Sequence, residues 1–313
     1  MYIKKIKFMV SILIATKNRP KKLSDCIKSI LKNNFKNFEI IIIDQTKDIF
    51  DSNLLLNKKI RYYHHPGSGK SIALNFAITQ TQGNIVSFTD DDCIVHKNWL
   101  KKIDFIFKKN LQISGIFGKS LPYQPEKHKN LINPPVFTKE NYEIFSNPAT
   151  IHYKEIGLGN NMAFRKSALE KVGLFKTWLG KGSVCQAGGI ESELIYRLFS
   201  KGYKLAYEPN IIIWHNRWIT ESENLKQQVK YTIGIMAFVT YSSIHDHNLK
   251  LKNYFTDRFK DRIILPWKYS FDQFRHLNYS KHIFKSFIYI FIELFSIVRG
   301  FIIGFYFSSI DRK

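Results

Sequence analysis

The sequence predicts an α/β protein with a doubly wound, mainly parallel sheet flanked by helices and an appended C-terminal helical region. In the first half of the chain, short apolar runs alternate with segments whose apolar residues recur at helical spacing, as is typical of βαβ units. Two of the apolar runs end in aspartate, at Asp44 and Asp90. After about residue 220 the character changes to long, aromatic and basic segments.

Strands and helices alternate along the first half. Four strands are expected, at residues 10–15, 38–43, 60–63 and 85–89. Apolar residues at i, i+3, i+4, i+7 and i+8 predict a helix face that begins at Leu23, and shorter patterns at helical spacing predict helix faces that begin at Ile72 and Leu100. Strands joined by helices of this length form right-handed crossovers and a parallel sheet that is covered on both faces.

The second half is less regular. Residues 121–148 are rich in Pro, Asn and Lys and predict a long excursion over the surface. We then expect a short strand at 161–164, a short helix from 166 and a glycine-containing loop at 173–189. A second helix at 191–201 and an extended segment at 204–214, which ends at His215, should follow.

The amino-acid composition indicates an anionic partner but does not identify it. The 313 residues carry a formal net charge of +23, which implies attraction to nucleic acid, an anionic bilayer or a phosphate-bearing substrate. The three cysteines are an odd number and widely spaced, so they form neither a disulfide framework nor a zinc site by themselves. We expect them to be buried small side chains in a reducing compartment.

The N-terminus is similar to a secretion signal, because Lys4, Lys5 and Lys7 precede an apolar run over residues 8–15. That run is short, lacks a small-residue cleavage site and leads directly into turn residues. A buried parallel strand is therefore the better interpretation.

The stretch His-His-Pro-Gly-Ser-Gly-Lys-Ser at residues 64–71 resembles the end of a P-loop. A P-loop has a glycine five positions before its Gly-Lys pair, because the backbone there curls around phosphates. This chain has His64 at that position. We therefore expect Lys70 to act through its side chain and not as part of a phosphate-cradling loop.

Aspartates follow two of the predicted strands. Ligands of a doubly wound sheet lie at the carboxyl ends of its strands, where Asp44 and the run Asp90-Asp91-Asp92 are expected. Three adjacent carboxylates repel one another, and a divalent cation that holds a diphosphate offsets this repulsion. Along extended backbone Asp90 and Asp92 point to the same side. The alternative is a solvated acidic turn.

Six stretches in sequence order carry a resemblance. They are SILIATKNRP, EIIIIDQTKD, GKSIALNFAI, GNIVSFTDDDCIVHKNWL, GNNMAFRKSALEKVG and GGIESELIYRLFSKGYKLAYEPNIIIWH. Over roughly residues 8–220 this ordered set resembles the family 2 glycosyltransferases of the GT-A fold. The resemblance implies inverting transfer of a sugar from a nucleoside diphosphate sugar, with Mg²⁺ or Mn²⁺ as cofactor. It also implies a glycosyltransferase domain over residues 1–220 and a separate helical region over 221–313.

The resemblance also assigns roles to individual residues. It implies nucleotide-sugar binding by Thr16, Asn18, Asp44, Lys70, Asp90, Asp91 and Asn161, and metal binding by Asp90, Asp92 and His215. Thr16, Asn18 and Asp44 match positions beside the nucleobase, and Lys70 one beside phosphate and ribose. Asn161 matches the floor of the sugar pocket. His215 alternatively only caps its strand.

The catalytic base is where this chain departs from the family pattern. The family commonly shows Glu-Asp-x-Glu-Leu, with the aspartate as base, whereas this chain has Ile190-Glu191-Ser192-Glu193-Leu194. Glu191 takes the aspartate position and is the expected base, with Glu193 as the alternative. Because Ile190 replaces the first acid, a catalytically silent nucleotide-sugar-binding or scaffold protein is the rival interpretation.

The tail is long enough to cross a bilayer, over residues 287–310. Its polar residues fall in one narrow helical sector that includes Lys285, Glu293, Ser296, Arg299 and Gly300. This favours an amphipathic helix that lies in the interface of an anionic membrane, while packing on its own domain and spanning are the alternatives. We expect a cytoplasmic enzyme, peripheral at the inner face of the cell membrane, with a saccharide or lipid-linked acceptor. Nucleic acid is not an expected partner, because the acidic strand ends repel phosphate.

Overall fold

The computed structural model describes residues 9–311 except 134–135, 147–155, 187, 246–255, 257–259, 261–263 and 265–280. The chain divides into two compact units, one comprising Met1–Lys176 and Leu194–Glu221, the other Thr177–Glu193 and Ser222–Lys313. The division at residue 220 into two domains stays a prediction, because the second unit also takes in a segment that precedes this position.

The first unit is built on one sheet, whose strands have the order β3-β2-β1-β4-β8-β6-β9-β5, with β7 also paired to β9. The strands are β1 (Val10–Thr16), β2 (Phe38–Asp44), β3 (Ile60–His64), β4 (Ile85–Phe88), β5 (Cys93–Val95), β6 (Ile113–Pro122), β7 (Glu143–Phe145), β8 (Met162–Arg165) and β9 (Lys204–His215). The pairs among β1 to β4 are parallel, and β8 runs antiparallel to both β4 and β6. The sheet is therefore mixed.

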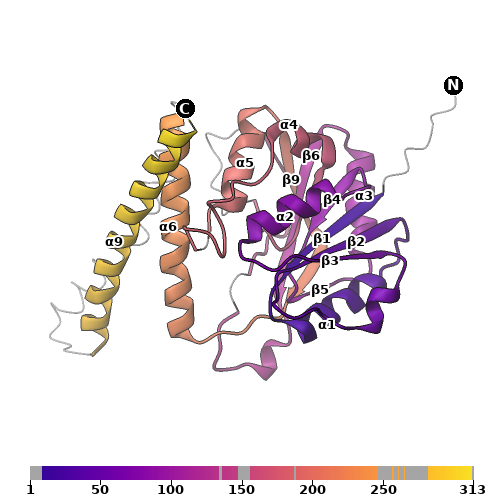
Figure 1. Ribbon diagram of the computed structural model, residues 1–313, viewed down its shortest axis with the longest axis horizontal. Helices are drawn as coiled ribbons and strands as arrows, with labels where there is room; N and C mark the ends of the chain where they lie inside the picture. Colours follow the sequence, from indigo (N-terminus) through magenta and orange to yellow (C-terminus); the bar gives the residue numbers. More distant parts are fainter. Residues whose placement is uncertain are drawn as a thin grey trace. The chain divides into compact units, whose positions relative to one another are not determined.

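Helices cover both faces of the parallel half of this sheet (Figure 1). Apolar residues of α1 (Pro20–Leu31) and α3 (Trp99–Lys109) form one core cluster with Ile12, Ile14 and Ile40 of the strands. Helix α2 (Lys70–Thr79) contacts β1 and β2 outside that cluster. Strands that are buried on both faces read as continuous apolar runs, which is why this half could be predicted from the sequence.

The predicted fold class is confirmed, including the helices on the sheet and the C-terminal helix. The strand expected at residues 10–15, within the run that resembled a signal, is the buried strand β1. Helices α4 (Lys166–Val172) and α5 (Ile190–Ser200) also match the expected segments. The three cysteines are free and buried, as expected.

The second unit contains two long helices, α6 (Glu221–His245) and α9 (Lys281–Ile310), which lie side by side (Figure 1). Helix α9 includes Ile288–Ile310, the one candidate membrane span among the described residues, with a mean hydropathy of 2.0. The Lys285 side chain lies outside the described residues.

Candidate active site

The acidic turn Asp90–Asp92 lies between β4 and β5, at the carboxyl end of β4. Because β1 is the parallel neighbour of β4, the end of β1 lies beside this turn. The Thr16 hydroxyl donates a hydrogen bond of 2.7 Å to Asp91 Oδ2, and the two side chains are buried. The fold therefore brings Thr16 and Asp91, two of the predicted residues, into direct contact.

Arg19 links two carboxylates of the turn. Its Nη1 lies 2.9 Å from Asp91 Oδ1 and 2.7 Å from Asp92 Oδ2. Both aspartates are almost fully buried, whereas the Arg19 side chain is 29% exposed. Arg19 precedes the Pro20 that begins α1, so the helix start positions it. The sequence offered no separate signal for this role beyond the Thr-Lys-Asn-Arg-Pro turn.

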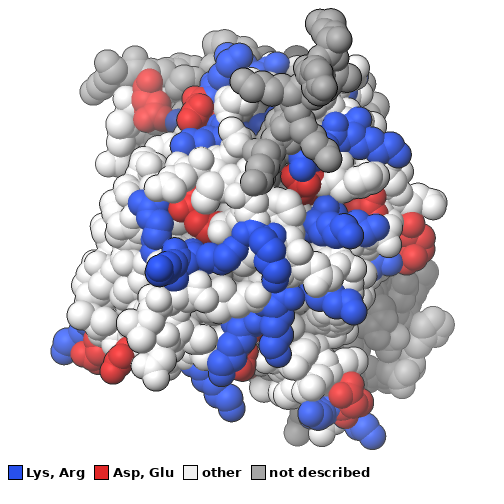
Figure 2. Space-filling model, turned by 90° about the vertical axis from the view of Figure 1, so that its right-hand side faces the viewer, with Lys and Arg blue, Asp and Glu red and all other residues white. Residues whose placement is uncertain are grey.

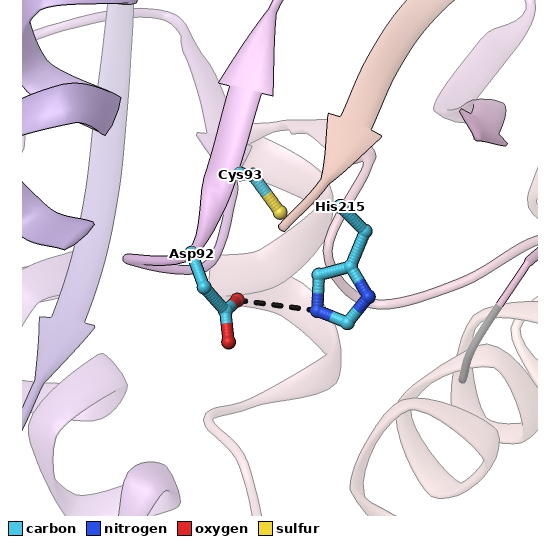
Figure 3. Close-up of side chains that lie close together, drawn as sticks. All are labelled: Asp92, Cys93 and His215. Atoms are coloured by element: carbon cyan, nitrogen blue, oxygen red, sulfur yellow. Dashed lines mark ion pairs between the residues drawn. The ribbon is translucent and has the colours of Figure 1, made fainter. Parts of the chain in front are cut away.

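Asp92 and His215 face each other at the edge of the sheet (Figure 3). They meet because β5 pairs antiparallel with β9 and sets Cys93 opposite His215. Asp92 Oδ1 lies 3.2 Å from His215 Nε2. Among the described residues, Asp92 Oδ1 and His215 Nδ1 are buried without a hydrogen-bond partner. The facing atoms, Asp92 Oδ1 and His215 Nε2, are a carboxylate oxygen and an imidazole nitrogen, which are donor types that bind divalent cations.

Cys93 is the third member of this group, and the ligand atoms of Asp92, Cys93 and His215 lie within 4.8 Å of one another. Burial, together with the charges of Asp92 and Asp90, raises the pKa of the Cys93 thiol well above its usual value. A neutral thiol is a poor ligand for Mg²⁺ or Mn²⁺, which prefer oxygen. The donor set that fits such a cation is therefore Asp92 with His215.

Asp90 pairs with Lys70. Lys70 Nζ donates a hydrogen bond of 2.6 Å to Asp90 Oδ1, and the two side chains are 24% and 30% exposed. Lys70 is the first residue of α2, after Gly69 at a φ of 115°. The structure thus brings Asp90 and Lys70 together, while the metal-binding role predicted for Asp90 stays a prediction.

The two buried aspartates differ in their electrostatics. Burial and the neighbouring charge of Asp92 raise the pKa of Asp91, against the opposing effect of Arg19. Burial also acts to raise the pKa of Asp92, but the contact with His215 and the charge of Arg19 outweigh it and hold this pKa below its usual value. Asp92 is therefore the member of the pair whose ionised form the site favours.

Asp44 and Asn18 lie at the ends of the neighbouring strands. Asp44, buried at the end of β2, accepts hydrogen bonds of 2.9 Å from the Tyr62 hydroxyl and from the backbone N–H of Thr46. Burial and the contact with Asp44 raise the pKa of Tyr62 to about 12. Asn18 has a φ of 57°, and its backbone N–H donates to Thr46 Oγ1. The nucleobase contacts predicted for both residues stay predictions.

The Asn161 amide is engaged inside the protein. Its Nδ2 donates hydrogen bonds of 2.9 Å to the carbonyls of Lys119 and Ile211, and its Oδ1 accepts one from Trp99 Nε1. The side chain thus ties β6, β9 and α3 together, and its predicted place in the sugar pocket stays a prediction. In the neighbouring Asn160, which the sequence did not single out, the buried Oδ1 has no hydrogen-bond partner among the described residues.

Glu191 and Glu193 occupy the first turn of α5 and belong to the second unit. Glu191 is partly buried, whereas Glu193 is 1% exposed. Two residues along a helix differ by about 200° in direction, which accounts for the different burial of the two side chains. Ile190, which replaces the family's first acid, is 4% exposed.

Comparison with known families gives a match over residues 11–173, about half of the chain, to the family described as glycosyl transferase family 2. An uncharacterized glycosyltransferase of Rickettsia conorii is 25% identical over 74% of this chain, which spans 36% of that relative. The UDP-Gal:alpha-D-GlcNAc-diphosphoundecaprenol beta-1,3-galactosyltransferase of Escherichia coli is 28% identical over 62% of this chain and 75% of its own length.

Solved structures support the fold. The mannosyltransferase PcManGT from Pyrobaculum calidifontis, in complex with GDP-Man and Mn²⁺, has a TM-score of 0.61 at 13% identity, over 96% of this chain and 88% of its own. TarS 1-349 of S. aureus in complex with UDP-GlcNAc has a TM-score of 0.54 at 15% identity, over 74% of this chain and 66% of its own.

Proposed function

Because the chain belongs to glycosyl transferase family 2, we propose that it transfers a sugar, with inversion, from a nucleoside diphosphate sugar to a saccharide or lipid-linked saccharide. The observation that carries this proposal is the acidic turn at the end of β4, where Thr16, Arg19 and Lys70 surround three carboxylates. A turn that only served solubility would not be buried and paired in this way.

Asp92 and His215 would hold the divalent cation, since Asp92 Oδ1 and His215 Nε2 face each other and Asp92 favours its ionised form. A bound cation supplies charge that stabilises the departing diphosphate. Lys70, at the start of α2 and partly exposed, adds a second positive charge that Asp90 holds in place. When the donor binds, the ammonium group can exchange this carboxylate for a phosphate oxygen at similar energy.

Glu191 would act as the general base. Its carboxylate takes the proton from the acceptor hydroxyl while the hydroxyl oxygen attacks the anomeric carbon from the face opposite the leaving group. The new glycosidic bond forms as the bond to the diphosphate breaks, so the anomeric configuration inverts. Glu191 is favoured over Glu193 because it is less deeply buried, and an acceptor must be able to reach the base.

We place the reaction in the synthesis of a cell-surface polysaccharide or glycolipid at the cytoplasmic face of the membrane. Support comes from the Escherichia coli relative, whose name gives a diphosphoundecaprenol acceptor, and from the apolar helix α9. The net charge of +23 favours an anionic leaflet and a phosphate-bearing acceptor alike.

One observation favours a second candidate, a catalytically silent nucleotide-sugar-binding protein. Ile190 is an apolar, buried residue where the family commonly has an acid. Donor binding without transfer or hydrolysis would support this candidate.

A thermal-shift screen of UDP-, GDP- and dTDP-sugars with Mn²⁺ tests the proposal. A ligand at a hundred times its Kd adds about 2.7 kcal/mol to the unfolding free energy, so one donor class should raise Tm by several degrees. The same screen on Asp92→Asn is the control and should show no shift. If no nucleotide sugar shifts the wild type with Mn²⁺, the proposed function is wrong.

A further inference from the structure

Helix α9 packs on α6 through a stripe of small residues, which comprises Ser296, Gly300, Gly304 and Ser308 at intervals of four. A Cβ atom added to Gly300 would lie 2.5 Å from Met236 Cβ and 2.8 Å from the Ile233 carbonyl oxygen. At Gly304 it would lie 2.5 Å from the Ala237 carbonyl oxygen. The backbones thus approach closely only because glycine is present, an arrangement common between helices in membranes.

These contacts also fix the direction of the pair. Gly300 meets Ile233 and Met236, and four residues later Gly304 meets Ala237 and Thr240, so the helices run parallel. Further along, the Tyr241 hydroxyl donates a hydrogen bond of 2.6 Å to Asp311 Oδ2. The stripe is therefore held toward α6 over several turns.

Several polar residues of α9 face inward, whereas Arg299 is partly exposed. Glu293 and Ser296 are 0% and 1% exposed, and Glu293 Oε1 accepts a hydrogen bond from the Tyr289 hydroxyl. This differs from the helix expected from the sequence, in which the polar sector would face lipid headgroups. Glycine and serine are the residues that allow close helix packing, and in this protein α6 takes up that side.

The opposite side of α9, the outward face, is apolar and exposed. Its most exposed members are Phe291 (73%), Phe295 (71%), Ile302 (65%), Phe305 (61%) and Tyr306 (60%). A helix at the surface of a water-soluble protein places polar residues there. Here the order is reversed, with glutamate and serine inside and phenylalanine and isoleucine outside. A continuous apolar surface of this kind marks an interaction site.

We propose that the outward face of α9 is embedded among the acyl chains of a lipid bilayer, with the α6–α9 pair lying along the membrane surface. The face extends along Ile288–Ile310, so its apolar contact is long, and Arg299 within it is only partly exposed. A span is disfavoured because the parallel register sets the exposed Lys230 of α6 level with the middle of α9. A lysine at the bilayer centre is energetically unfavourable.

This inference rests on the proposed function and deepens it. It names the surface of the protein that contacts the membrane in which a lipid-linked acceptor lies. It also predicts a different dependence on conditions from that expected from the sequence alone. Because the most exposed residues of the outward face are uncharged and Arg299 is only partly exposed, the full-length protein should bind vesicles of neutral phosphatidylcholine and stay bound in 1 M NaCl.

Vesicle flotation with a triple variant, Phe295→Gln, Ile302→Gln and Phe305→Gln, tests the outward face. Its partition into phosphatidylcholine vesicles should fall at least tenfold, because each change removes apolar contact area. The matched control is Ile49→Gln, Leu56→Gln and Leu111→Gln, three residues of the first unit that are 67%, 82% and 64% exposed. The control should bind vesicles as the wild type does.

Fluorescence quenching gives the second readout. A dye attached at Phe295→Cys should be quenched by acyl-brominated lipid, and one at Leu56→Cys should not. Binding only to anionic vesicles with release by salt would overturn the proposal, as would a wild-type dimer that the triple variant abolishes. A retained donor thermal shift shows that the triple variant is folded. It also separates failure of this inference from failure of the proposed function.

Discussion

Arg19 joins two buried carboxylates through a single guanidinium nitrogen, and this contact supplies positive charge to the acidic turn when no cation is bound. Leaving buried carboxylates unpaired costs about 3–5 kcal/mol, although the partial exposure of Arg19 reduces that figure here. Arg19 also bonds to Asp92 Oδ2, which leaves Oδ1 directed at His215. The residue therefore positions the pair that would hold the metal.

Arg19→Met should lower the thermal stability and make it depend on metal. With the guanidinium absent, a divalent cation becomes the main positive charge near Asp91 and Asp92, so Mn²⁺ should raise Tm more in this variant than in the wild type. Thermal denaturation with and without Mn²⁺ measures both effects. Arg61→Met, which removes the distant pair with Glu39, is the control and should leave the response to Mn²⁺ unchanged. An equal Mn²⁺ shift in wild type and Arg19→Met contradicts this role.

Glu191→Gln should preserve donor binding and reduce transfer by about 10²–10⁴-fold, since it keeps the shape of the side chain and removes only the proton acceptor. Steady-state kinetics measures the loss of transfer, and the thermal shift caused by the donor shows whether donor binding is preserved. The matched variant is Glu193→Gln, which should affect stability more than the chemical step because Glu193 is buried. If Glu193→Gln reduces transfer and Glu191→Gln does not, the general base is Glu193 and not Glu191.

At this scale the sequence and its family resemblance singled out the carboxylates, Lys70 and His215, and their functional roles stay predictions. The sequence did not predict the Arg19 bridge or the proximity of Cys93 to His215. That proximity depends on the register of β5 against β9, and a three-residue strand carries too little periodic signal to set a register.

At the scale of elements, β6 is the longest strand that sequence reasoning missed, and the three-residue strands β5 and β7 were missed as well. Strand β6 reads Ile-Ser-Gly-Ile-Phe-Gly-Lys-Ser-Leu-Pro, and two glycines with a lysine disrupt the apolar pattern. The structure explains the glycines, because a Cβ at Gly115 would overlap the Phe164 ring and one at Gly118 would overlap the Ile211 carbonyl oxygen. Glycine in a strand often marks such a close approach. The sequence of β6 alone does not show which neighbouring strand or ring would approach each glycine.

Gly118→Ala should therefore destabilise the first unit by about 1–3 kcal/mol, as overpacking of a core does. Leu111→Ala, at a residue that is 64% exposed, is the control and should change the unfolding free energy by less than about 0.5 kcal/mol. Chemical denaturation measures both variants. An unchanged midpoint for Gly118→Ala would mean that β6 and β9 do not approach as closely as the structure shows.

At the scale of the whole molecule, the positive surface charge and the acidic turn contribute differently to the binding of anionic ligands. Figure 2 shows Lys and Arg side chains over much of the middle of one face, with Asp and Glu scattered among them. Such a surface attracts anions in general and does not select one. Selection falls to the few groups at the carboxyl end of β4, where carboxylates would bind phosphate only through a cation. The sequence predicted both features, but only the fold shows that Arg19 and Lys70 lie against the carboxylates.

The central claim, metal-dependent transfer with inversion, is tested most directly by the anomer that the enzyme forms first. Proton NMR of an α-linked nucleotide sugar, incubated with the wild type and Mn²⁺, should show slow release of the nucleoside diphosphate with the β-anomer of the sugar appearing first. Release should cease in excess EDTA and in Asp92→Asn. Release that persists in EDTA, or that yields the α-anomer first, would contradict the account.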